Sequence, residues 1–63
     1  MSELSLKVLA YLRSHSDKKS FTAIDLNIAG FSFQEANQAI DELEECGYIE
    51  VNHRFINHSF ELI

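Results

Sequence analysis

The sequence predicts a small α+β fold, mostly α, in which three helices are followed by a C-terminal β-hairpin. Two segments with apolar residues at helical spacing each begin after a serine suited to an N-cap, and a shorter helical segment lies between them. The C-terminal part is instead rich in β-forming residues. The chain has no proline and no low-complexity segment that would mark a linker, so we expect one domain over residues 1–63.

The first predicted helix covers residues 3–14. Ser2 is a suitable N-cap, because its hydroxyl can accept a hydrogen bond from a backbone N–H of the first turn. The apolar residues of this helix fall on one face: Leu4, Val8, Tyr11 and Leu12. Leu9 lies at the edge of that face, and Leu6 lies nearly opposite it, where we expect it to be exposed. The polar residues 15–20 should form a loop.

The second predicted helix is short and covers residues 23–29. Thr22 and Asp25 resemble a capping box at its start. Gly30 fits the left-handed stop that follows many helices. Phe21 precedes the cap and can pack back onto the helix as part of a hydrophobic staple. Phe21 is also compatible with a very short strand.

The third predicted helix, residues 33–46, has the clearest separation of apolar and polar faces. Ser32 and Glu35 form a capping box at its start, and Gly47 ends it. The face expected to enter the core contains Phe33, Ala36, Ala39, Ile40, Leu43 and Cys46. The opposite face contains Gln34, Glu35, Asn37, Gln38, Asp41, Glu42, Glu44 and Glu45. An amphipathic helix packed on a core requires this separation.

Two strands are predicted after the third helix, over residues 48–51 and 59–63. Their connection has two interpretations. It is either one long loop with Phe55 and Ile56 at an apolar tip, or two Asn-His turns that flank a third strand at 54–56. In the second case one of the two apolar residues would be buried. We favour the two-stranded hairpin.

The order of helix, short helix, three-residue turn at 30–32, longer helix and hairpin resembles the winged helix-turn-helix fold over nearly the whole chain. The passage LEECGYIE, residues 43–50, is similar to the one by which that family leaves its recognition helix. It contains a leucine, a spacer, a glycine and an aromatic–aliphatic pair before the wing. The resemblance implies a compact three-helix winged helix-turn-helix domain whose wing is the C-terminal hairpin.

The resemblance also implies a binding surface. In DNA-binding members the recognition helix enters the major groove through its N-terminal half. The corresponding face for a protein partner or DNA comprises Gln34, Asn37, Gln38, Asp41, Glu42 and Glu45. The residues implied for the wing are His53, Arg54 and Phe55. Amide side chains can pair with the edge of adenine, whereas the acids of this face would approach phosphates.

The charge of the chain opposes a role in nucleic-acid binding. Its formal net charge is −5, and non-specific affinity for DNA comes mainly from basic side chains that contact phosphates. The basic residues are spread along the sequence, with only Lys18 and Lys19 adjacent: Lys7, Arg13, Lys18, Lys19 and Arg54.

Two functions therefore stay open. One is a non-enzymatic regulatory module that binds a protein partner through its acidic third helix or its wing. The other is a DNA-binding transcriptional regulator that acts as a dimer through the third helix and the wing. A homodimer could form through Leu6 or Leu9 of the first helix, or through the edge of the hairpin.

The sequence predicts no catalytic site, cofactor or metal. Glu44 and Glu45 point in different directions on a helix, and Cys46 falls on the core side, where thiols are usually inert. His53 and His58 lack the further ligands of a zinc site. Three aromatic residues are expected in the core or in a staple rather than as platforms for base stacking: Phe21, Phe31 and Phe33.

The sequence also gives no signal for a membrane. Its longest unbroken apolar run is Val8 to Leu12, whereas a spanning helix needs about 20 residues and a signal peptide an apolar run of roughly 7 to 15. The single cysteine fits a reducing compartment. We therefore expect a soluble, cytoplasmic protein.

Overall fold

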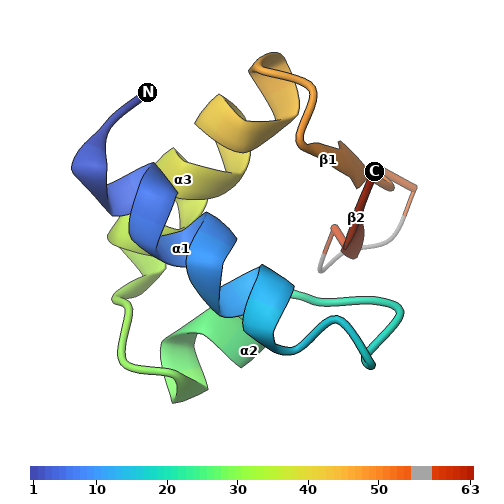
Figure 1. The fold of residues 1–63 in the computed structure, drawn as a ribbon, viewed down its shortest axis with the longest axis horizontal. Helices are drawn as coiled ribbons and strands as arrows, with labels where there is room; N and C mark the ends of the chain where they lie inside the picture. The colour runs from blue at the N-terminus through green and yellow to red at the C-terminus, as the bar shows by residue number, and fades with distance from the viewer. Residues whose placement is uncertain (55–57) are drawn as a thin grey trace.

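The computed structural model describes residues 1–54 and 58–63. The elements within them are α1 (Glu3–Ser14), α2 (Ala23–Ile28), α3 (Phe33–Glu45), β1 (Ile49–Val51) and β2 (Phe60–Leu62). In Figure 1, α1 lies in front of α3, α2 lies below α1, and the two strands lie to the right, beside the loop that joins α1 to α2. The α+β fold with mostly helical content is confirmed.

The predicted helices are confirmed with small shifts at their ends. α1 has the predicted bounds, while α2 and α3 each end one residue early, at Ile28 and Glu45. In both cases the chain then passes through a glycine with positive φ, 110° at Gly30 and 82° at Gly47. The strands are shorter than predicted, at three residues each.

The ends of α2 and α3 are closed by the same pattern of hydrogen bonds. After α2, the N–H of Phe31 donates to the carbonyl of Leu26 at 3.0 Å; after α3, the N–H of Tyr48 donates to the carbonyl of Leu43 at 2.9 Å. This is the Schellman arrangement, which needs a left-handed residue after the cap and therefore favours glycine. The two glycines thus set the direction in which the chain leaves each helix.

The helices pack around one core that also includes the hairpin. Its buried hydrophobic residues are Val8, Leu9, Leu12, Phe21, Leu26, Ala36, Ala39, Ile40, Leu43, Ile49 and Phe60. Ser5 is buried as well, because it lies on the inner side of α1, and its hydroxyl accepts a hydrogen bond from the hydroxyl of Ser2 at 3.1 Å. The apolar spacing of this helix does not predict a buried polar residue at this position.

The hairpin is attached to the helical part through Phe21. Phe21 and Phe60 exchange two backbone hydrogen bonds of 2.8 Å, so the expected short strand is a single bridge. Their rings stack with centroids 5.9 Å apart, and both side chains are almost fully buried. Phe60 also pairs with Val51 in the antiparallel sheet. The Phe21–Phe60 pair therefore links the hairpin to the loop between α1 and α2.

Two expectations about the core, and one about a dimer surface, were wrong. Phe33 is 54% exposed, because it is the first residue of α3 and lies at the edge of the buried stripe. Cys46 is exposed, because the helix ends one residue before it and the cap turns it outward. Leu9 is only 4% exposed and so offers no surface for a dimer, whereas Leu6 is exposed as predicted.

The third strand considered at 54–56 falls largely outside the described residues. Arg54 itself lies in a turn. Phe55 and Ile56, including the apolar tip suggested for them, lie outside the described part of the chain. Among the residues that are described, no helix has the length and apolar character needed to cross a bilayer.

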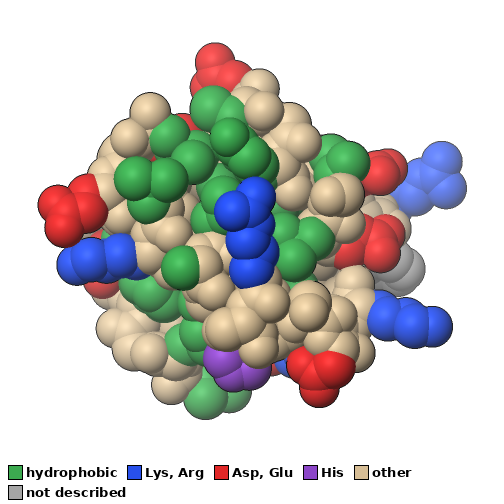
Figure 2. Space-filling view, in the orientation of Figure 1, with side chains coloured by type: hydrophobic (Ala, Val, Ile, Leu, Met, Phe, Trp, Pro, Cys, Tyr) green, Lys and Arg blue, Asp and Glu red, His purple; other side chains and the backbone are tan. Residues whose placement is uncertain are grey.

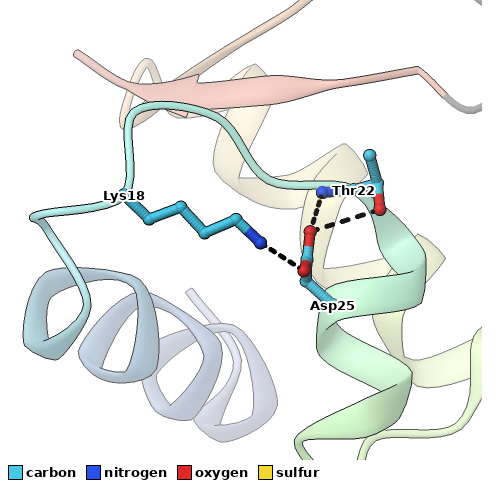
Figure 3. Close-up of polar contacts among 3 residues, drawn as sticks. All are labelled: Lys18, Thr22 and Asp25. Carbon is cyan, nitrogen blue, oxygen red and sulfur yellow. Dashed lines mark hydrogen bonds and ion pairs between the residues drawn. The ribbon is translucent and has the colours of Figure 1, made fainter.

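A polar network holds the loop after α1 against the start of α2 (Figure 3). The ammonium group of Lys18 donates to one oxygen of Asp25, and the backbone N–H of Thr22 donates to the other at 2.8 Å. Burial alone would raise the pKa of the Asp25 carboxyl. The hydrogen bonds from Lys18 and Thr22, together with the Lys18 charge, outweigh burial and hold this pKa below its ordinary value of 3.8.

The first prediction concerns the aromatic link. Replacing Phe60 by alanine should cost about 3–5 kcal/mol of unfolding free energy. A chain of 63 residues has only about 3–9 kcal/mol in total, so this variant should lose a large share of its stability. Leu6→Ala, at an exposed position, should stay within about 0.5 kcal/mol of the parent. Urea denaturation followed by circular dichroism measures both, and equal losses would contradict the packing described.

The second prediction concerns acid stability. Folding lowers the pKa of Asp25. The contribution of its ionised carboxylate to the free energy of unfolding is therefore fully present above the unfolded pKa of 3.8, and it is lost as the pH falls through the lower pKa of the folded state. Asp25→Asn should therefore lower stability at neutral pH. It should also make stability fall less steeply as the pH drops below 3.8. Urea midpoints measured across this range test it, with Glu50→Gln on the exposed side of β1 as the control. An unchanged slope in Asp25→Asn would contradict the network.

Candidate functional site

Four exposed residues form a polar stripe along the outer side of α3. Gln34, Gln38, Asp41 and Glu45 follow one another at spacings of four, three and four, opposite the buried residues of the helix. α3 contains no Lys, Arg or His, so the charges on this stripe are only negative. We call these four residues the outer stripe.

The two other residues of the predicted face lie on either side of the outer stripe. Asn37 is exposed toward the hairpin. Glu42 is half-buried on the opposite side, where its carboxylate accepts a hydrogen bond of 2.6 Å from the backbone N–H of Ser2. The predicted face is therefore divided, and Glu42 serves to hold the N-terminal end of the chain against α3.

The environment of Glu42 favours its charged form. The hydrogen bond from the backbone N–H of Ser2 is the main cause, with a contribution from the side chain of Ser5. Together they hold the pKa of Glu42 below its ordinary value of 4.5. Glu42 thus stays in its charged form. The positive N-terminal end of α1 also favours a negative charge at this position.

A groove of about 220 Å³ separates the outer stripe from the hairpin. It is lined by Ala23, Ile24, Phe33, Asn37, Ile40, Asp41, Glu44, Val51, His53 and His58. Ile24 and Phe33 form its apolar side and are 48% and 54% exposed. The groove therefore joins apolar surface from α2 and α3 to acids of α3 and histidines of the hairpin connection.

One polar contact connects α3 to the far side of this groove. The Nε2 atom of His53 lies 2.8 Å from a carboxylate oxygen of Glu44. The ring of His53 also lies edge-on to that of His58, with centroids 5.2 Å apart. Among the described residues, no group of three His, Cys, Asp or Glu side chains is placed to hold a metal ion. The arrangement keeps the hairpin close to α3.

Three of the five basic residues are engaged with other side chains of the domain. The ammonium nitrogen of Lys7 lies 3.9 Å from a carboxylate oxygen of Glu3, and Lys18 is paired with Asp25. The Arg13 guanidinium lies 5.9 Å from the centre of the Tyr48 ring. On the face seen in Figure 2, Lys and Arg side chains lie apart from one another: one lies near the centre among hydrophobic and neutral groups, and the others lie at the edges near Asp or Glu side chains. Arg54 is exposed in the turn after β1, so of the predicted wing residues His53 and Arg54 are described, and Phe55 is not.

Sequence reasoning did not identify the apolar side of the groove. The capping pattern predicts α2 but not which of its faces is exposed, and Leu26 is the only one of its six residues that is buried. Ile24 and Ile28 lie four residues apart on the other side of α2 and are 48% and 80% exposed. Their spacing was visible in the sequence and would have indicated a second apolar face on this short helix.

The chain was also compared with known proteins. Neither the known protein families, nor the curated proteins, nor the solved structures give a match to it.

Proposed function

We propose that this chain is a small, non-enzymatic regulatory module with a winged-helix fold, which binds a basic protein partner through the outer stripe of α3. The order of the elements supports the fold: α2, a turn and α3 correspond to the helix-turn-helix, and the β1–β2 hairpin corresponds to the wing. Because a fold can serve unrelated functions, the function rests on the surface chemistry.

The observation that carries the proposal is the absence of positive charge on the outer stripe. A carboxylate about 4 Å from a phosphate is repelled by about 1 kcal/mol in water and by about 4 kcal/mol at an effective dielectric constant of 20. A good contact between an amide side chain and adenine contributes only about 1–3 kcal/mol. Asp41 and Glu45 would therefore offset most of what Gln34 and Gln38 could contribute on DNA.

A cationic protein surface reverses the sign of this interaction. Opposite potentials across an interface speed the encounter and select the partner, even where they add little net affinity. Asp41 and Glu45 are exposed and lie on one stripe, so both could face basic residues of one partner. The net charge of −5 adds a long-range attraction to the same cationic partner.

A second candidate is a DNA-binding regulator that acts as a dimer. Gln34, Asn37 and Gln38 are all exposed on the N-terminal half of α3, and Arg54 is exposed in the turn of the hairpin. Two linked copies would add avidity to a weak single contact. The charges of the outer stripe favour the protein partner over this alternative.

The third prediction separates the two functions by direct titration. At about 50 mM salt, where phosphate contacts tighten steeply, the protein should give no anisotropy change with random duplex DNA up to high micromolar concentration. It should bind a fluorescent oligolysine peptide under the same conditions. Binding to DNA but not to oligolysine would reject the protein-partner proposal.

A pair of charge-matched variants assigns the surface. Asp41→Asn/Glu45→Gln removes two charges from the outer stripe, and Glu50→Gln/Glu61→Gln removes two from the exposed side of the hairpin. The first should weaken oligolysine binding several-fold more than the second, although both have the same net charge. Equal weakening would mean that only net charge matters, and the outer stripe would be rejected as the binding surface.

A further inference from the structure

The groove beside the outer stripe has an apolar side that no residue of the described chain covers fully. Ile24 and Phe33 leave about half of their surface in water, while Ile40 is buried and Val51 is half-buried at the same groove. Contiguous apolar surface with a polar rim marks contact sites more often than isolated exposed residues do. The polar rim here consists of Asn37, Asp41, Glu44, His53 and His58.

The size of the groove limits what can occupy it. Sites for small-molecule ligands usually have volumes of about 300–1,000 Å³, whereas this groove has about 220 Å³. One large side chain, such as phenylalanine or leucine, is a more suitable guest than a whole ligand. A side chain that fills a pocket at the centre of an interface is also the usual source of its binding energy.

The charges around the groove indicate what should flank that side chain. Asp41 lies on the rim and is exposed, and Glu44 is next to it. Among the described residues that line the groove, none is Lys or Arg. The Glu44 carboxylate already contacts Nε2 of His53 at 2.8 Å and is only partly exposed, whereas Asp41 is exposed, so we expect Asp41 to be the acid that contacts the guest segment. Basic residues on either side of the apolar guest would meet this charge and the acids of the outer stripe.

We infer that the groove receives one large apolar side chain from a lysine- or arginine-rich segment of the protein partner. This inference rests on the proposed function and adds to it where the apolar side chain of the partner, here called the anchor, binds and which residues flank it. A second copy of this chain is a poorer occupant, because each copy has a net charge of −5 and like charges across an interface are unfavourable. The contact between His53 and Glu44 joins two residues of the groove's rim, one from the hairpin and one from α3.

The fourth prediction uses three short peptides as probes: one with a central phenylalanine flanked by lysines, one with alanine in its place, and one with glutamates in place of the lysines. In two-dimensional ¹H–¹⁵N spectra, the first should shift the signals of Ile24, Phe33 and Val51. The alanine peptide should bind about tenfold more weakly, which corresponds to about 1.4 kcal/mol. The glutamate peptide should not bind.

Two matched pairs of variants locate the anchor. Ile24 lines the groove and Ile28, on the same helix, does not. Ile24→Ala should therefore weaken binding of the phenylalanine peptide about tenfold. Ile28→Ala should weaken it less than twofold. Asp41 lines the groove and Glu45 does not, so Asp41→Asn should weaken it more than Glu45→Gln. All four positions are exposed, and circular dichroism checks that each variant is folded.

The outcomes distinguish failure of the groove from failure of the proposed function. Equal binding of the phenylalanine and alanine peptides, or shifts confined to the outer stripe, would overturn the groove and leave the outer stripe intact. Binding of duplex DNA with no binding of either cationic peptide would overturn both. Groove signals that shift with protein concentration in the absence of peptide would show that a second copy occupies the groove, and would also overturn the inference.

Discussion

Burial of one stripe of α3 is the constraint on which the rest of the structure depends. Ala36, Ala39, Ile40 and Leu43 leave water together, and they form one core with residues of α1, α2 and the hairpin. Once that stripe faces inward, the helical period places the outer stripe in solvent. The acids of the outer stripe, Asp41 and Glu45, are thus held outward by the same packing that stabilises the domain, and their position does not depend on a partner.

The hairpin adds the second feature of the site. The pairing of Phe21 with Phe60 fixes it to the helical part, and His53 contacts Glu44 at the other edge. Between these two attachments the hairpin lies close enough to α3 to form a groove, and Ile24 and Phe33 supply the apolar side of it. The proposed binding surface combines a charged helix face with a neighbouring recess, which would suit a segment that is both basic and apolar.

Local signals in the sequence predicted most of the helical structure, because caps, glycine stops and apolar spacing act within a few residues. Ser32 with Glu35, and Gly30 and Gly47, behaved as their sequence context indicated. The errors lay where neighbours along the chain do not decide the outcome. Phe33 and Cys46 are at helix ends, where the wheel assigns a face but packing leaves the residue exposed. The hydrogen bond of Glu42 to Ser2 and the groove join distant segments, so only the tertiary structure reveals them.

The central claim is that the outer stripe presents a negative surface that attracts cations and repels polyanions. Paramagnetic relaxation by small cationic and anionic nitroxide probes measures this potential directly, one amide proton at a time. We expect the cationic probe to relax the amide protons of Gln38, Asp41 and Glu45 more strongly than the anionic probe, with the difference shrinking as salt shortens the screening length below about 10 Å. Equal relaxation by the two probes, or stronger relaxation by the anionic one, would contradict the account.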